Sequence, residues 1–302
     1  METGKWANLL MAVSGIVAAY ASRSDALLVD GLYSGVNFVS AIIAARISIA
    51  VSRPADRRYP FGYDAYEALY VKYRSLVLIG IMAFAVFGAL SKIVTYLSGG
   101  QVPELVFGPI LIYSVVMITI CFTLAFWHRY NWKRSGSRSD ILKTESRAAV
   151  VDGIISAGAG GGLLSAALLR GTSLAPVVPV ADSIVVLILC LVIAKQPIAM
   201  YVGSLREVAG SAAPADVIAA ATSKTKEILG QQPIAVLDVA VTKLGRSYFV
   251  VPYLKPEEPM QAGEVDALRR ELEASYTEIL GVTKTEIILT AELHHEGNGD
   301  SE

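Results

Sequence analysis

Six long apolar segments dominate the first two thirds of the chain. They cover roughly residues 6–22, 26–51, 68–97, 103–127, 145–170 and 178–203. A helix needs roughly 20 mostly apolar residues to cross the hydrocarbon core of a bilayer. The first segment is the shortest, and no small-residue cleavage site clearly follows it, so we interpret it as a retained span rather than a signal peptide. The pattern predicts an all-α transmembrane domain of six spans over residues 1–208.

Positive charges gather in two of the loops between these segments. One set lies between the second and third segments, and a larger set lies between the fourth and fifth: Arg53, Arg57, Arg58, Arg129, Lys133, Arg134, Arg138 and Lys143. Loops rich in Lys and Arg face the cytoplasm in multi-pass membrane proteins. We therefore expect a multi-pass protein of the cell inner (plasma) membrane, embedded in the lipid bilayer, with both termini in the cytoplasm.

Charged residues appear at the frequency of a soluble protein after the last apolar segment. The pattern reads helix at 216–229, strands at 236–242 and 248–254, helix at 264–280 and strand at 286–293, with a turn at Gly245 between the first two strands. It predicts a compact α+β domain over residues 209–293, of the order α-β-β-α-β. Such a small domain would gain stability from pairing with a second copy. Residues 294–302 are predicted to form a disordered tail.

Composition supports membrane residence and narrows the classes of function. The 302 residues are 54% hydrophobic and 18% charged, and their mean hydropathy is +0.51. The net charge of −1 shows no basic excess and argues against nucleic acid as a partner. Neither of the two cysteines stands in a metal-binding or disulfide pattern. Motifs of hydrolases and phosphate-binding loops are also missing from the sequence, so we predict that the chain is not an enzyme and holds no permanent cofactor.

Two acidic residues lie deep within the apolar segments, where an ionisable group costs on the order of 2.5–3.5 kcal/mol to insert. They are Asp30 and Asp152, and each stands in a similar hexapeptide, VDGLYS and VDGIIS. Helical periodicity places each acid on a polar stripe. The two stripes are Asp30, Tyr33, Ser34 and Asn37 in the second segment and Glu145, Ala149, Asp152 and Ser156 in the fifth. We expect the two stripes to face each other.

A basic residue accompanies these acids. Arg74 lies in the third segment, two helical turns after Glu67. We expect Arg74 to pair with Glu67, Asp30 or Asp152, because a charge in the membrane needs a partner. Such a pair would lower the affinity of the site for a divalent ion.

Several motifs together resemble those of the cation diffusion facilitator family, whose members exchange a divalent metal ion for protons. They are ALLVDG at residues 26–31, RPADRRYPFGY at residues 53–63 followed by Glu67, and the acids Asp152 and Asp182 in the fifth and sixth spans. The resemblance runs over nearly the whole chain. It implies a ferredoxin-like cytoplasmic domain in the tail and a homodimer.

The resemblance also implies where the transported ion binds. The family's site consists of a His or Asp with an Asp four residues later, once in the second span and once in the fifth. Those positions fall on Tyr33 and Asn37 and on Ala148 and Asp152. Zinc is held by His, Cys and carboxylate groups, whereas the remaining oxygen donors suit Mn²⁺, Mg²⁺ or a monovalent ion better.

These observations favour a secondary transporter that exports a cation, such as Zn²⁺, Mn²⁺ or Fe²⁺, in exchange for protons. A carboxylate in the membrane can alternate between binding a proton and binding a cation. We expect the transport site at Asp30, Tyr33, Asn37 and Asp152, with Ser156, Asp56 and Arg74 as secondary candidates. A member of the family that has lost transport and acts as a scaffold or regulatory partner is the alternative, as is a carrier of a non-zinc or monovalent cation.

Overall fold

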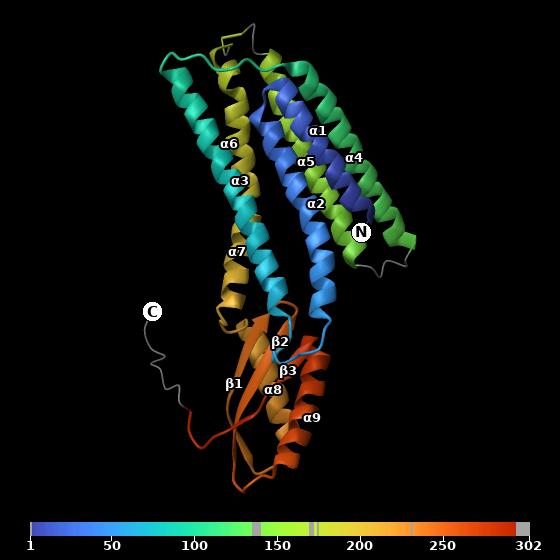
Figure 1. Ribbon diagram of the computed structural model, residues 1–302, viewed down its shortest axis with the longest axis vertical. Coiled ribbons are helices and arrows are strands. Elements are labelled where there is room, and N and C mark those ends of the chain that lie inside the picture. The colour runs from blue at the N-terminus through green and yellow to red at the C-terminus, as the bar shows by residue number, and fades with distance from the viewer. Residues whose placement is uncertain (1, 135–139, 169–171, 174, 231, 294–302) are drawn as a thin grey trace. The chain divides into compact units, whose positions relative to one another are not determined.

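The computed structural model describes the chain except for residues 1, 135–139, 169–171, 174, 231 and 294–302 (Figure 1). The predicted terminal tail therefore lies outside the described residues. The chain divides into two compact units. The first contains Met1–Arg46 and Tyr73–Met200, and the second contains Ile47–Lys72 and Tyr201–Glu302. The predicted domain boundary at residue 208 stays a prediction.

Helices occupy the position of each predicted span. They are α1 (Glu2–Ser22), α2 (Asp25–Val51), α3 (Ala65–Leu97), α4 (Phe107–Arg134), α5 (Asp140–Leu168), the short 3₁₀ helix η2 (Ala175–Val180), α6 (Ala181–Ile193) and α7 (Lys195–Val208). Within the described residues, four stretches are long and apolar enough to cross a membrane: Asp25–Val51, Ala65–Leu97, Phe107–Asn131 and Ala175–Val208. The last stretch joins η2, α6 and α7. The count of six spans stays a prediction.

Apolar side chains of the first unit point both inward and outward. Ala89, Ile110, Leu163 and Val186 come from four different helices and are fully buried in one core cluster. Large apolar side chains also cover the outside, as at Leu191, which is 80% exposed. A soluble protein does not normally leave contiguous apolar surface uncovered. The outer surface of these helices therefore suits hydrocarbon rather than water.

Asp182, at the start of α6, holds the start of α2. Its carboxylate accepts hydrogen bonds from the Ser24 hydroxyl at 2.5 Å and from the backbone N–H groups of Asp25 at 2.8 Å and Ala26 at 3.3 Å. The first N–H groups of a helix have no partner within the helix, and a negative charge there is favourable. Asp182 is only 3% exposed. This buried acid of the sixth predicted span therefore caps a helix.

The second unit contains a small mixed sheet with two helices. Its elements are α8 (Ala215–Leu229), β1 (Ile234–Leu244), β2 (Ser247–Pro256), α9 (Ala262–Leu280), β3 (Thr283–Thr285) and β4 (Ile288–Leu289). Strand β1 pairs antiparallel with β2, while β3 and β4 both pair parallel with β2. Leu244 pairs with Ser247 across the predicted turn, where Gly245 has a φ of +61°. Glycine adopts this left-handed conformation without the steric cost that other residues meet.

The predicted tail helices and the first two strands are confirmed to within a few residues. The third strand was predicted at 286–293, and this prediction is wrong at both ends, because β3 starts at Thr283 and β4 ends at Leu289. Thr283 and Thr285 are buried, whereas Lys284 between them is only half-buried. Polar residues thus form this strand, which hides it from a search for apolar alternation. The exact ferredoxin-like order stays a prediction.

The core of the tail domain lies between the helices and the sheet. Val250 and Leu254 from β2 and Leu272 and Tyr276 from α9 are completely buried. The Tyr276 hydroxyl lies 2.5 Å from the hydroxyl of Thr225 in α8, so the buried phenol has a polar partner. Burial raises the pKa of Tyr276. These contacts fix both helices against the sheet.

The segment before α3 packs on this domain within the second unit. Asp64 is 6% exposed, and its carboxylate pairs with Lys284 of β3 and lies 4.0 Å from Nε of Arg246. Lys284 also donates a hydrogen bond to the carbonyl oxygen of Phe61 at 2.6 Å. A Cβ on Gly245 would overlap the carbonyl oxygen of Asp64. The β1–β2 turn therefore needs glycine for its backbone angle and for this close approach.

Candidate functional site

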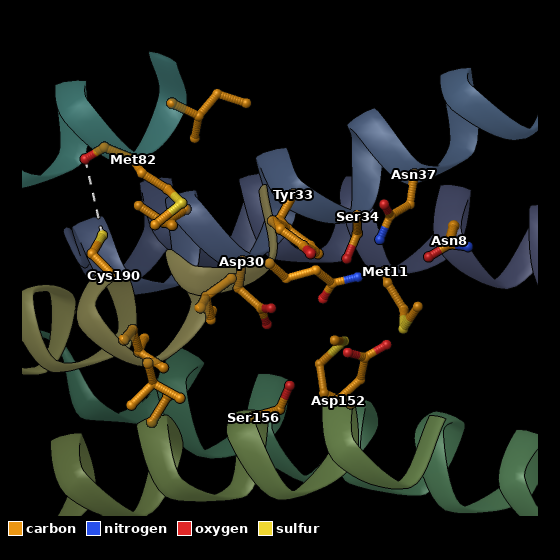
Figure 2. A pocket seen from close by; sticks show the side chains of 18 of the residues that line it. Asn8, Met11, Asp30, Tyr33, Ser34, Asn37, Met82, Asp152, Ser156 and Cys190 are labelled. Carbon is orange, nitrogen blue, oxygen red and sulfur yellow. Dashed lines mark hydrogen bonds between the residues drawn. The ribbon is translucent and has the colours of Figure 1, made fainter. Parts of the chain in front are cut away.

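A cavity of about 480 Å³ lies within the first unit, and helices α1 to α7 all contribute to its wall (Figure 2). Both membrane acids line it, Asp30 from α2 and Asp152 from α5. Apolar side chains form much of the remaining wall, among them Met11, Met82 and Met117. The cavity thus joins a few polar groups to an apolar lining, which is typical of a binding site for a small ligand or an ion.

The predicted polar stripes meet at this cavity. Asp30, Tyr33, Ser34 and Asn37 line it from α2, and Asp152 and Ser156 line it from α5. Figure 2 shows the α2 side chains and the α5 side chains on opposite sides of the same space. The periodicity of 3.6 residues per turn explains why each set shares one face of its helix. Of the predicted α5 stripe, Glu145 has a side chain outside the described residues, and Ala149 does not line the cavity.

Asp30 is held by groups from two other helices. The Tyr113 hydroxyl of α4 donates a hydrogen bond to Oδ2 of Asp30 at 2.8 Å, and Ser156 of α5 also interacts with this carboxylate. Gly15 of α1 leaves the space for this arrangement. A Cβ on Gly15 would lie 2.6 Å from the Cα of Gly31 and 3.0 Å from the Tyr113 hydroxyl oxygen. The close crossing of α1 and α2 therefore needs glycine on both sides.

Asp152 is exposed at the cavity wall, and it interacts with other described residues as well. The phenol of Tyr33 lies within the electrostatic reach of both Asp152 and Arg74. The cavity therefore brings a carboxylate, a phenol and a guanidinium close together. The carboxylate and phenol oxygens of this group can coordinate a hard cation.

Arg74 contacts an amide of α2. Its Nη2 donates a hydrogen bond to Oδ1 of Asn37 at 2.9 Å. The expected pairing of Arg74 with Glu67, Asp30 or Asp152 stays a prediction. The guanidinium Nε is buried and makes no hydrogen bond within the described chain. Asn37 is one of the four positions at which the resemblance implies an ion ligand. A permanent positive charge therefore lies next to one of the positions at which the resemblance implies an ion ligand.

Sequence reasoning missed four polar residues at or beside the cavity. Asn8, Lys195 and Gln196 line it directly, and Tyr113 reaches it through its bond to Asp30. Lys195 and Gln196 interrupt the last apolar stretch, and this interruption was the signal that could have found them. Tyr113 gave a weaker signal, because a tyrosine within an apolar helix is common.

Asp56 does not line this cavity. It lies in the segment before α3, where its carboxylate accepts hydrogen bonds from the Tyr63 hydroxyl at 2.7 Å and from the backbone N–H groups of Arg58 and Tyr59 at 2.8 Å. The bond from Tyr63 is the main reason why the pKa of Asp56 is lower than usual. The ring of Tyr59 packs at 4.5 Å from that of Tyr63. These contacts fold the loop locally.

The donor set at the cavity differs from a zinc site. Among the residues that the structure describes, no three His, Cys, Asp or Glu groups gather where they could share a metal ion. Cys121 and Cys190 are both buried and free of disulfide bonds. Oxygen atoms of carboxylate, phenol, amide and hydroxyl groups are the donors that line the space, and they match hard cations rather than zinc.

Comparison with known proteins agrees with the membrane architecture. Residues 4–208 match the cation efflux transmembrane domain family. The chain is also 34% identical over 91 residues to magnetosome protein MamB of Paramagnetospirillum magneticum, and the aligned segment spans 30% of each chain. The family match covers more than half of the sequence and includes every helix around the cavity. This protein therefore belongs to the cation efflux family, also called the cation diffusion facilitators, and is a multi-pass membrane protein.

Proposed function

We propose that this protein is a secondary transporter that exports a cation from the cytoplasm in exchange for protons. The observation that carries the proposal is the pair of carboxylates, Asp30 and Asp152, on two helices of one membrane cavity. Placing ionisable groups in a membrane domain is costly, and they are retained where an ion or proton visits them. Membership of the cation efflux family supports the same conclusion.

The proposed transport site consists of Asp30, Tyr33, Asn37 and Asp152, with Ser156 beside them. The two carboxylates alternate between holding protons and holding the cation, while the phenol and amide oxygens serve as neutral ligands. Tyr113 orients Asp30 by its 2.8 Å hydrogen bond to Oδ2. Two titratable acids give the site the capacity to exchange protons for a cation.

Six spans, cytoplasmic termini and an inner-membrane location are part of this proposal. Helices occupy all six predicted positions, and the basic loops favour this orientation. We also propose that the protein works as a homodimer. The tail domain is small, and large apolar residues such as Ile279 in α9 and Val282 just after it are exposed. Pairing with a second copy would cover such surface.

A scaffold without transport activity is the second candidate function. The observation that favours it is the loss of carboxylate or imidazole at Tyr33, Asn37 and Ala148, the three positions where the resemblance implies ligands. Relatives that keep those ligands could then do the transport. The retention of both Asp30 and Asp152 supports the transporter, because a scaffold gains nothing from their insertion cost.

A flux assay tests the proposal. Purified protein is reconstituted into vesicles that contain a pH-sensitive dye, and Zn²⁺, Mn²⁺, Mg²⁺, Na⁺ or K⁺ is added outside. A transporter moves protons in response to at least one of these ions, whereas a scaffold stays silent with all of them. Asp152→Asn is expected to abolish the signal, and Asp30→Asn is expected to reduce it at least tenfold.

Asp25→Asn is the matched control. Asp25 is an acid of the same helix as Asp30, but it pairs with Lys92 at 2.6 Å and does not line the cavity. Its variant should keep native flux. Full flux in the Asp152→Asn variant, or equal loss in all three variants, would show that the cavity acids are not the transport site.

A further inference from the structure

Arg74 places a fixed positive charge at the cavity. Its Nη2 lies 2.9 Å from Oδ1 of Asn37, and Asn37 lines the cavity. Arginine stays protonated in proteins and offers only hydrogen-bond donors, so it cannot serve as an ion ligand. The same guanidinium acts electrostatically on Tyr33, a second residue of the proposed site. Arg74 therefore competes with any cation for the oxygen of Asn37 and repels it.

We propose that Arg74 is a specificity residue that makes this cavity select singly charged cations over divalent ones. The proposal rests on the proposed function, since it names the class of cation that the same site carries. It also assigns a role to a residue that does not itself coordinate the ion. A cation bound at the site senses the guanidinium through space rather than through a bond.

Geometry sets the strength of this repulsion. Metal ions lie roughly 2.0–2.6 Å from oxygen ligands, so an ion bound to Oδ1 of Asn37 lies at most about 5.5 Å from Nη2 of Arg74. The repulsive energy is proportional to the charge of the ion and is screened less inside a protein than in water. A divalent ion at this position is therefore repelled twice as strongly as a monovalent ion.

The other charges at the cavity also favour a singly charged cation. Two acids, Asp30 and Asp152, line it together with the basic Lys195, and Arg74 adds a second positive charge through Asn37. With both acids ionised, the formal charges of these four residues balance. A divalent ion would leave two uncompensated positive charges in a site with low dielectric constant, and a monovalent ion would leave one.

Equilibrium binding tests this inference independently of transport. The affinities of the purified full-length protein for Na⁺, K⁺ and Mn²⁺ are measured by titration calorimetry in detergent at constant ionic strength. The native protein should bind Na⁺ or K⁺ more tightly than Mn²⁺. Arg74→Gln removes the charge and should tighten Mn²⁺ binding at least tenfold relative to Na⁺. Arg74→Lys keeps the charge and should retain the native order.

Two further variants make the result specific. Lys92→Gln removes another positive charge of α3 that pairs with Asp25 away from the cavity lining, and it should leave every affinity unchanged. Asp152→Asn in the Arg74→Gln background should remove the gained Mn²⁺ binding, which places the new ion in this cavity. Gel filtration and thermal unfolding check that each variant is folded.

Several outcomes overturn the inference. They are a native protein that prefers Mn²⁺, an Arg74→Gln variant with the native ratio of affinities, and an Arg74→Lys variant that behaves like Arg74→Gln. If Arg74→Gln does not fold, the order of affinities of the native protein decides alone. Absence of flux in vesicles would reject the proposed function, while the binding order would still test the role of Arg74.

Discussion

The contact between α4 and α5 gives a prediction with opposite signs at two neighbouring glycines. A Cβ on Gly160 would overlap the Ser114 hydroxyl oxygen and lie 2.7 Å from the Cβ of Ser114, whereas a Cβ on Gly158 would meet no atom within 4 Å. Gly160→Ala should therefore destabilise the protein, and Gly158→Ala should stabilise it slightly. Both changes add one methyl group to the same helix, two residues apart.

The magnitude follows from the geometry at Ser114. Rotating its hydroxyl away would break the 2.8 Å hydrogen bond to the Ile110 carbonyl oxygen, at a cost of about 1 kcal/mol. Rotation does not move the Cβ of Ser114. Helices α4 and α5 must therefore also separate until the distance between this atom and the new Cβ at residue 160 increases from 2.7 Å to an ordinary contact of 3.4 Å. Overpacking of this kind costs about 1–3 kcal/mol. The gain of about 1 kcal/mol from replacing a helical glycine by alanine offsets part of this.

We expect Gly160→Ala to lower the free energy of unfolding by about 2 kcal/mol, from the terms above. Gly158→Ala should raise it by about 0.5–1 kcal/mol. Thermal unfolding in detergent, followed by circular dichroism, should show Tm lower by roughly 4–8 °C for the first variant. The double variant Gly160→Ala with Ser114→Gly should recover part of the loss, because it removes the overlapping atoms. Equal shifts in Tm for Gly158→Ala and Gly160→Ala would refute the reasoning.

Three further predictions concern charged residues outside the proposed ion site. Asp182→Ala should lower the free energy of unfolding by about 2 kcal/mol, seen as a lower Tm, and Asp182→Asn should lower it less, because the amide oxygen still accepts a hydrogen bond. Tyr63→Phe should raise the pKa of Asp56 toward its ordinary value, which carboxyl ¹³C NMR can measure. Because the folded pKa of Asp56 is depressed, the native bond contributes stability above about pH 4, and this stability is lost as pH falls through the folded pKa. An unchanged titration midpoint of Asp56 in the variant would contradict the assigned cause. Lys284→Ala should lower the free energy of unfolding by about 1 kcal/mol, because the buried Asp64 loses its closest cation while Lys284 itself is partly solvated. An unchanged Tm would show that this ion pair does not stabilise the fold.

Local periodicity was enough to predict most of the helices and the two polar stripes. Asp30, Tyr33 and Asn37 line the cavity because residues three and four apart share a helix face. The same reasoning worked for β1 and β2, where a glycine turn separates two alternating segments. These features depend on residues close together in the chain.

Features that depend on distant contacts could not be predicted from the sequence. Asn37 and Arg74 lie 37 residues apart, and no pattern in the chain distinguishes this partner of Arg74 from an acid. The polar strand β3 is formed because Thr283 and Thr285 are buried by the fold. The run of glycines at 158–162 gave no sign that Gly160 packs tightly while Gly158 does not.

The cap on α2 has a consequence for biosynthesis. The backbone N–H of Asp25 donates a hydrogen bond to the carboxylate of Asp182, which is translated 157 residues later. A nascent chain that does not yet include Asp182 leaves the first backbone N–H groups of α2 without this carboxylate partner. The last hydrophobic stretch therefore completes a helix made near the start of translation, and truncation before Asp182 should leave the early spans without their native end.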